Sequence, residues 1–334
     1  MSTEKKRIAL IGGAGFIGHN LASKLKAEGH EVYVIDSMFV NNMLSFYHIY
    51  NTSPNKEMYV NFIMERMKIL NDAKIPVYIQ DARDYPAMCK ILLKEIKPHV
   101  VVLLAAVSHA DRSNKDPYST FDHSLRTLEN ALDATKDTIE HFIYFSSSMV
   151  YGNFDNDMVT EETVCNPLGI YGALKIAGER IVMAYNQVFG LPYTIIRPSA
   201  LYGQRCVSRR VLQIFLENSL KNMPIVLKGG GSDRLDFTYI DDLVHGVQCV
   251  INNKASINQT FNLTYGQSRS MKEVIDIMHE YIPNLNVKYE DQDRLVPKRG
   301  TLCIDKAKTT IGYNPQYPLE KGLYEYLKWY KTIL

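Results

Sequence analysis

Short apolar runs alternate with amphipathic stretches over roughly the first 200 residues of the chain. The runs are rich in Val, Ile, Leu and Phe, as expected for strands that are buried on both faces of a sheet. They span residues 7–11, 32–35, 76–79, 100–104, 141–145 and 193–197. Helical spacing lies between most of them, which is the order of repeated β-α-β units. The pattern therefore predicts an α/β fold with a Rossmann-type doubly wound parallel sheet.

Residues 38–74 interrupt this alternation. The segment is longer than an ordinary connection, is rich in methionine and has helical spacing over 59–70. We therefore expect an insertion with its own helix. Two roles are open for it: a packed helix that uses methionine to fill gaps, or a lid over the substrate.

The pattern changes again beyond residue 198. Helical spacing returns at 207–222 and at 319–330, a glycine turn lies at 229–231, and short strands are expected near Phe237 and Phe261. Two further helix starts are predicted from capping residues. Asp241 is a candidate cap, and Ser270 with Glu273 forms the pattern of a capping box.

These elements predict two interleaved domains. The expected NAD-binding Rossmann domain comprises residues 1–197 and about 236–264, and a smaller α/β domain for the substrate comprises about 198–235 and 265–334.

Composition narrows the class of ligand. The chain has 334 residues, of which 46% are hydrophobic and 22% charged, and its net charge is +2. This near balance and the lack of a long basic run argue against nucleic acid as a partner. No apolar stretch approaches the length of a membrane span. We expect a protein that binds a small molecule.

The cysteines indicate a reducing compartment. Five are present, an odd number, at positions 89, 165, 206, 249 and 303. Their spacing fits neither a disulfide framework nor a zinc site. We therefore expect a cytoplasmic protein without a metal ion.

A glycine-rich turn follows the first predicted strand and opens a helix. Glycines there allow a pyrophosphate to approach the backbone, and the helix N-terminus offers free N–H groups. An acidic residue ends the second strand about 20 residues later, where its carboxylate can bind ribose hydroxyls and repel a 2′-phosphate. The alternative is an ordinary tight turn. The pattern favours NAD over NADP, with the candidate contacts Gly12, Gly15, Phe16, Ile17, Gly18 and Asp36.

A second motif, Tyr171 with Lys175, can move a proton. Two other tyrosine–lysine pairs share this spacing, but only Tyr171 lies downstream of a strand that ends in hydroxyl groups, Ser146 to Ser148. Four-residue spacing places Lys175 on the same helix face as Tyr171. A neighbouring ammonium lowers the pKa of a phenol, so that Tyr171 can accept the proton of a hydroxyl group as hydride leaves its carbon.

Together these motifs resemble the extended short-chain dehydrogenases/reductases, specifically the NAD-dependent nucleotide-sugar epimerase/dehydratase family. The resemblance covers nearly the whole chain. Its elements are residues 12–18, 81–84, 104–106, 146–152, 171–175, 197–198 and 202–203.

The resemblance implies roles for individual residues. Asp81 and Ala82 would border the adenine, Leu104, Ala105 and Ala106 would lie against the cofactor, and Ser147, Tyr171 and Lys175 would be catalytic. The implied contacts of the nucleotide sugar are Ser108, His109, Ser148, Met149, Arg205, Arg234 and Arg299. His109 could alternatively be a structural histidine or a second acid/base. The resemblance also implies a homodimer built from residues 118–136 and 171–189, whose apolar positions could instead be buried within one subunit.

Two departures from the family pattern concern the substrate. Ser148 and Met149 occupy the positions where dehydratases carry an Asp-Glu pair, so a 4,6-dehydratase is disfavoured. Leu235 replaces a phosphate-binding arginine, for which Arg209, Arg210 or Arg234 could compensate.

The activity implied is epimerisation, most simply at C4 of the sugar. Two alternatives release a keto sugar: a nucleotide-sugar dehydrogenase or a 4,6-dehydratase. A third is a non-catalytic protein that binds the dinucleotide as a sensor or scaffold.

Overall fold

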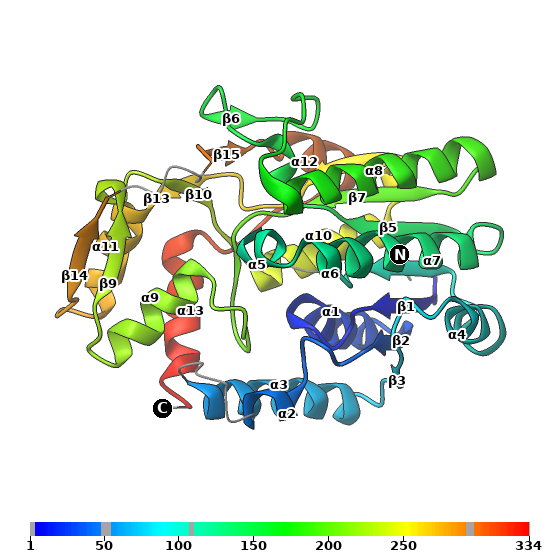
Figure 1. Ribbon diagram of the computed structural model, residues 1–334, viewed down its shortest axis with the longest axis horizontal. Helices are drawn as coiled ribbons and strands as arrows, with labels where there is room; N and C mark the ends of the chain where they lie inside the picture. The colour runs from blue at the N-terminus through cyan, green and yellow to red at the C-terminus, as the bar shows by residue number, and fades with distance from the viewer. Residues whose placement is uncertain (1–3, 48–54, 107–109, 292–296, 334) are drawn as a thin grey trace.

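A seven-stranded parallel sheet forms the centre of the computed structural model, which describes residues 4–47, 55–106, 110–291 and 297–333. The strand order is β12-β7-β5-β4-β1-β2-β3, with the chain switching direction beside β1 (Figure 1). The strands are β1 (Arg7–Ile11), β2 (Glu31–Asp36), β3 (Val77–Ile79), β4 (Val100–Leu103), β5 (His141–Phe145), β7 (Tyr193–Arg197) and β12 (Gln259–Asn262). The prediction of a doubly wound α/β sheet is confirmed.

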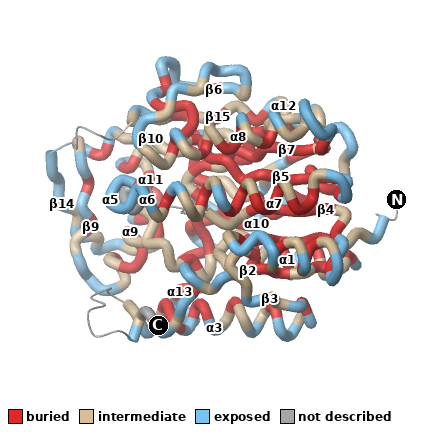
Figure 2. The backbone as a smooth tube through the Cα atoms, turned by 45° about the vertical axis from the view of Figure 1, so that its right-hand side comes forward, coloured by how far each residue is buried: buried red, intermediate tan, exposed pale blue. Residues whose placement is uncertain are grey.

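Alternate residues of the central strands belong to different hydrophobic cores. In β1, Ile8 and Leu10 pack into one cluster, whereas Ala9 and Ile11 pack into the other. Successive side chains of a strand point to opposite faces, so this sheet is covered on both sides. Figure 2 shows the central strands as almost continuously buried, which explains their unbroken apolar sequence.

Helices cover both faces of the sheet. On one face lie α1 (Phe16–Ala27) and α10 (Ile240–Asn252), which pack against each other (Figure 1). On the other face lie α4 (Tyr85–Cys89), the π-helical turn Lys90–Ile96, α7 (Thr127–Thr135) and α8 (Gly169–Phe189). Shorter elements precede α7: α5 (Ala110–Lys115), α6 (Pro117–Phe121) and the π-helical turn Asp122–Arg126.

The described part of the insertion contains two helices, α2 (Met43–Tyr47) and α3 (Lys56–Asp72). The predicted helix over 59–70 is confirmed. Its buried face packs against α1 and against the C-terminal helix α13 (Leu319–Tyr330), where the rings of Phe62 and Trp329 are 4.7 Å apart. The insertion is therefore a packed part of the molecule.

Smaller two-stranded sheets lie outside the central sheet. Their pairs are β8 (Leu201–Tyr202) with β11 (Thr238–Tyr239), β9 (Ile225–Lys228) with β14 (Val287–Glu290), β10 (Arg234–Asp236) with β13 (Ser268–Ser270), and β6 (Met158–Val159) with β15 (Thr301–Leu302). The helices there are α9 (Val211–Leu220), α11 (Met271–Tyr281), α12 (Asp305–Ile311) and α13, with 3-10 turns at Ser148–Tyr151, Gly229–Gly231 and Lys254–Ser256. The division into two domains stays a prediction.

The two predicted helix starts have different outcomes. Ser270 and Glu273 form the capping box expected at the start of α11. The prediction that Asp241 caps a helix is wrong, because α10 already begins at Ile240 and Tyr239 occupies the cap position. Asp241 lies in the first turn, where its charge still complements the helix dipole.

The described helices include none that is long and apolar enough to cross a membrane. Among the described residues there is also no group of three or more His, Cys, Asp or Glu that could hold a metal ion.

Candidate active site

The glycine turn brings the end of β1 against the end of β4. Gly12 has φ +85°, and a Cβ atom there would lie 2.6 Å from the backbone nitrogen of Ala105. A Cβ at Gly18 would lie 2.5 Å from the Cα of Gly13. Glycine is therefore required for this turn and for the close start of α1. The residue that precedes α1, Gly15, provides no side-chain cap, and the first turn of α1 has no acidic residue, so its N–H groups are available to an anion.

Asp36 ends β2 beside this turn. Its carboxylate accepts hydrogen bonds from the backbone N–H groups of Ala14, at 3.0 Å, and Met38, at 2.8 Å. Asn41 lies 3.5 Å away. Burial raises the pKa of Asp36, and these donors oppose the rise. The carboxylate of Asp36, which is predicted to bind ribose, is thus hydrogen-bonded to the glycine turn.

Two other predicted cofactor positions lie on neighbouring loops. Arg83 binds the carboxylate of Asp81 and lowers its pKa, and the Ala82 carbonyl accepts a hydrogen bond from Asn130. The backbone N–H groups of Leu104 and Ala105 both donate to Ile11. The predicted cofactor residues therefore lie at the C-terminal ends of β1 to β4, where doubly wound folds bind their ligands.

A cavity of about 400 Å³ begins at this edge. Ile17, Leu104 and Ala106 line it from the cofactor side, and Ser147, Tyr171 and Lys175 line it from β5 and α8. The structure thus brings predicted cofactor and catalytic residues to one cavity. Ser148, Met149 and Arg299 also line it.

Tyr171 and Ser147 form the centre of the candidate site. Ser147 and Tyr171 both line the cavity. Burial raises the pKa of Tyr171, whereas Arg210, the Ser147 hydroxyl and Arg299 each lower it. The cations with the clearest effect on this phenol are therefore arginines, and not Lys175 as its spacing suggested.

Lys175 lies a short distance from the Tyr171 ring. Its ammonium lies 5.9 Å from the centre of the Tyr171 ring and donates a 2.7 Å hydrogen bond to the carbonyl of Phe145. Burial lowers the pKa of Lys175 to about 8, against an opposing effect of Glu179. Lys175 thus fastens α8 to the end of β5.

A buried ion pair supports the same strand end. Glu179 on α8 pairs with Arg197 at the end of β7, with 2.6 Å between Oε2 and Nη2. Glu179 also accepts a hydrogen bond from Ser146, and Arg197 donates to Tyr151. Glu179 was not predicted from the sequence, although it follows Lys175 by about one helical turn and a charge on that inward face was a usable signal.

Arg299 crosses the cavity to the residues that replace the dehydratase pair. One of its nitrogens donates to the Ser148 hydroxyl, another contacts the sulfur of Met149, and the guanidinium lies 5.3 Å from the centre of the Phe154 ring. Burial lowers the pKa of Arg299 to about 10. Its Nε atom is buried without a partner in the described part of the chain.

The family follows from a comparison with known proteins. The model of the NAD dependent epimerase/dehydratase family matches residues 8–264. The chain belongs to this family.

Relatives with either activity resemble this epimerase/dehydratase along its length. An uncharacterized UDP-glucose epimerase of Bacillus subtilis is 28% identical over 325 residues, 95% of each chain. The dTDP-glucose 4,6-dehydratase of Xanthomonas campestris pv. campestris is 25% identical over 346 residues, 97% of this chain and 92% of the relative. The crystal structure of UDP-glucuronic acid 4-epimerase from Bacillus cereus, with UDP-glucuronic acid and NAD, covers 98% of this chain and 99% of its own, with a TM-score of 0.86 and 25% identity.

NAD is the cofactor of this epimerase/dehydratase. The described residues fit it: the glycine turn leaves no room for a side chain at Gly12 or Gly18, and the uncapped helix α1 begins beside the carboxylate of Asp36. NAD would supply a hydride acceptor to the cavity lined by Ile17 and Tyr171.

Arg209 and Arg210 are the cavity arginines that the sequence could not rank. Both lie just before α9 and line the cavity. Nη1 of Arg209 and Nε of Arg210 are buried without a partner in the described part of the chain. Each can therefore bind an anionic ligand without breaking a bond at that nitrogen.

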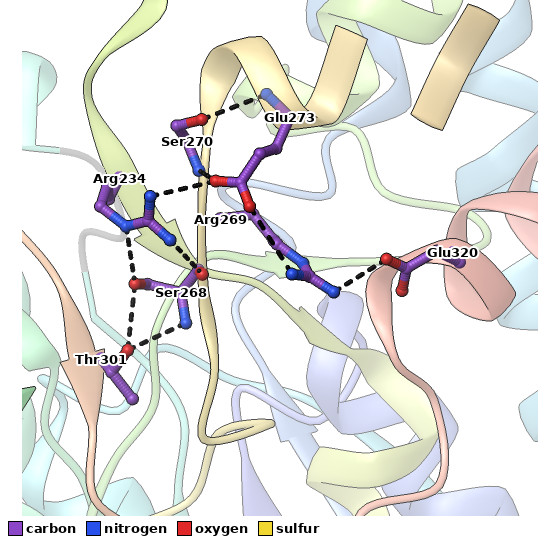
Figure 3. A network of polar contacts seen from close by, with 7 residues as sticks. All are labelled: Arg234, Ser268, Arg269, Ser270, Glu273, Thr301 and Glu320. Atoms are coloured by element: carbon purple, nitrogen blue, oxygen red, sulfur yellow. Dashed lines mark hydrogen bonds and ion pairs between the residues drawn. The ribbon is translucent and has the colours of Figure 1, made fainter. Parts of the chain in front are cut away.

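The structure does not bring Arg205 and Arg234 into this cavity. Arg205 turns toward α1 and α3, where it binds His19, Asn20 and Glu65. Figure 3 shows Arg234 bound to both the hydroxyl and the carbonyl of Ser268, and to Glu273.

Ser108 and His109 lie outside the described residues. The remaining predicted cofactor contacts, Asp81 and Ala82 among them, do not line the cavity, and their roles stay predictions.

Proposed function

We propose that this protein is a nucleotide-sugar epimerase that oxidises a sugar hydroxyl, at C4, to a ketone and restores it with the opposite configuration. One observation carries the proposal. The described lining of the cavity places Tyr171 and Ser147 beside three arginines and includes no Asp, Glu, His or Cys.

The chain's own residues divide the work as follows. Ser147 binds the reacting oxygen and Tyr171 removes its proton. Arg210 and Arg299 stabilise the phenolate, because their charges lower the pKa of Tyr171. NAD, when bound, would supply the hydride acceptor for the oxidation and the hydride donor for the reduction. Tyr171 then gives its proton back to the oxygen of the reduced sugar, so one residue serves as base and afterwards as acid.

The composition of the lining argues against loss of water. Elimination from a sugar requires a further acid and base beside those of the oxidation step. At the positions where the resemblance places the Asp-Glu pair of dehydratases, this chain has Ser148 and Met149, both bound to Arg299. The site therefore favours an epimerase over a 4,6-dehydratase.

The arginines support a nucleoside diphosphate as the carrier of the sugar. Arg209, Arg210 and Arg299 approach one cavity with unpartnered buried nitrogens in the described structure. Guanidinium groups bind phosphate oxygens with charge-assisted hydrogen bonds. We assign the diphosphate to these three arginines, with Arg209 and Arg210 in place of the arginine that Leu235 replaces. The UDP-sugars named for two relatives point to the same class of substrate.

Incubation with NAD and a panel of UDP-, GDP-, CDP- and dTDP-sugars tests this activity. We expect a product isomer of unchanged mass without net NADH, followed by NMR and mass spectrometry. Tyr171→Phe, which keeps the ring and removes the proton-exchanging group, should reduce turnover by ~10² or more.

Other products would overturn the proposal in recognisable ways. Loss of two hydrogens with formation of NADH means a dehydrogenase, and loss of water means a dehydratase. Binding of NAD without turnover of any sugar in the panel means a sensor or scaffold.

A homodimer is part of the same proposal. The short helix α6 lies next to α8 and exposes Tyr118 and Phe121, and α8 exposes Val188 near its end. Leu128 and Leu132, which were expected to be shared with a partner or buried in one subunit, are fully buried in the core of this chain. The exposed apolar groups around α6 and α8 support association through these helices.

A further inference from the structure

The segment that carries the cavity arginines is backbone-strained at two positions. Arg205 has φ 63° and Arg209 has φ 50°, both in the left-handed region that L-residues with side chains avoid. Such conformations persist only where the surroundings hold them. The segment between β8 and α9 must therefore be fixed from outside if Arg209 and Arg210 are to keep their places.

Helix α3 of the insertion holds the first strained position. The guanidinium of Arg66 donates from Nε, at 3.0 Å, and also from Nη2, to the carbonyl oxygen of Arg205. Nη1 of the same group donates to Asn41, at 2.8 Å, and Asn41 lies beside the carboxylate of Asp36. Arg66 is only 1% exposed. One buried side chain thus joins the loop after β2 to the arginine segment.

The same helix holds the second position through a relay. The hydroxyl of Tyr59 donates to Glu217, at 2.6 Å. Glu217 accepts a further hydrogen bond from Gln213, at 2.8 Å, and the side-chain oxygen of Gln213 accepts the backbone N–H of Arg209, at 2.9 Å. Tyr330 of α13 also donates to Glu217. All four of these side chains are buried.

Tyr59 and Arg66 lie on one face of α3. They are seven residues apart, which is about two helical turns. No residue of α2 or α3 is among the described residues that line the cavity. These helices therefore affect the site through the segment that carries the arginines, and not by direct contact with the ligand.

We propose that the insertion helix is a clamp that positions Arg209 and Arg210 for the substrate, with Tyr59 and Arg66 as its two positioning residues. The proposal rests on the proposed function for the identity of the ligand, a nucleoside diphosphate sugar. The clamp itself is a relation between α3 and the segment at 205–210. It gives the insertion a role in substrate affinity that neither gap filling nor a lid describes.

Two variants of the full chain test the clamp. Tyr59→Phe removes one hydroxyl and keeps the ring, and Arg66→Met keeps much of the buried volume. Each should raise KM for the nucleotide sugar about tenfold, the size of effect expected when a supporting hydrogen bond is lost, and should lower kcat by a smaller factor, because Arg210 also lowers the pKa of Tyr171. Met64→Leu changes an exposed side chain of the same helix, and Tyr313→Phe removes a buried hydroxyl that binds Thr264 elsewhere. These controls should leave KM unchanged.

Hydrogen exchange gives a readout that does not depend on turnover. Peptides that cover 205–213 should exchange faster in Tyr59→Phe and Arg66→Met than in the wild type or in either control, since the N–H of Arg209 loses the support of its acceptor. Unchanged exchange together with an unchanged KM would overturn the clamp, even if both variants lowered Tm.

Failure of the proposed function can be told apart from failure of the clamp. If no sugar is turned over, titration calorimetry with UDP replaces KM. Weaker UDP binding with faster exchange at 205–213 in both variants would uphold the clamp without the epimerase. Wild-type affinity and wild-type exchange would reject it.

Discussion

Lys175 illustrates how burial changes a residue whose role was inferred from spacing. The sequence placed it beside Tyr171, and it does lie on the same face of α8. Its ammonium nevertheless donates a hydrogen bond to the carbonyl of Phe145. The positive charges that lower the pKa of the Tyr171 phenol are those of Arg210 and Arg299. The proximity of these arginines depends on distant parts of the chain, which local spacing cannot reveal.

The buried ammonium makes a prediction about pH. The pKa of Lys175 is about 8 in the folded protein and 10.5 in its ordinary state, so between these values the unfolded chain binds more protons. The contribution of Lys175 to stability should therefore rise with pH across this window, by up to about 3 kcal/mol. Urea unfolding of the wild type and of Lys175→Met at pH 7, 8, 9 and 10 measures this change. The free energy of unfolding of the wild type minus that of the variant should increase with pH.

A surface variant separates this effect from the general response to pH. Lys328→Met removes an exposed ammonium from α13. The prediction would be contradicted if the gap between wild type and Lys175→Met stayed constant over the window, or if Lys328→Met showed the same growth.

Individual site residues could be predicted from the sequence where their role depends on local backbone geometry. Gly12 and Gly18 occupy turns that a Cβ would block, and Asp36 follows from the strand before it. Which arginines face the cavity could not be predicted in this way. Whether Arg205 or Arg209 faces the cavity depends on left-handed backbone at both positions, which nothing in their sequence required.

Among elements, the contact between α8 and β5 sets the position of the catalytic pair. Gly178 faces the ring of Tyr144 on β5, and a Cβ there would overlap its hydroxyl and approach Leu128 Cδ2 to 3.2 Å. The ammonium of Lys175 lies 5.3 Å above the same ring. The glycine therefore allows α8 to come close enough for Lys175 to reach the end of β5.

Gly178→Ala should move α8 outward despite the better helix propensity of alanine. We expect a loss of about 1–3 kcal/mol in the free energy of unfolding, as for other overpacked cores, together with reduced turnover. Urea unfolding and the sugar assay measure both. The double variant Gly178→Ala/Tyr144→Phe removes the overlapping hydroxyl and should recover part of each loss. Wild-type stability of Gly178→Ala alone would show that this contact is unimportant.

Most elements were predictable because they repeat a strong local pattern. The runs at 7–11, 141–145 and 193–197 are strands with those bounds, and 319–330 is a helix. A short strand was expected near Phe261 in the part of the chain assigned to the Rossmann domain, but its place beside β7 in the central sheet, as β12, was not predicted. Pairing between residues so far apart in sequence leaves no periodic signal in either segment.

For the whole molecule, the exposed apolar groups on α6 and α8 make a prediction about assembly. We expect the 38.2 kDa chain to sediment as a dimer. Tyr118→Asp places a charge on the most exposed of these groups, at 87% exposure, and should shift the equilibrium toward monomer. Tyr289→Asp, on β14 and 65% exposed, is the matched control and should remain dimeric. A monomeric wild type would refute the assembly.

The position of β12 in the sheet has a consequence for synthesis. Its residues come from far beyond β7, with α9, β9, β10 and α10 made in between, yet it pairs with β7 from Thr194 to Arg197. A nascent chain that ends at residue 197 therefore has all other strands of the central sheet but leaves the outer edge of β7 without its neighbour. Completion of the central sheet must therefore await translation through Asn262, after the segment that carries α9, β9 and β10 has already been made.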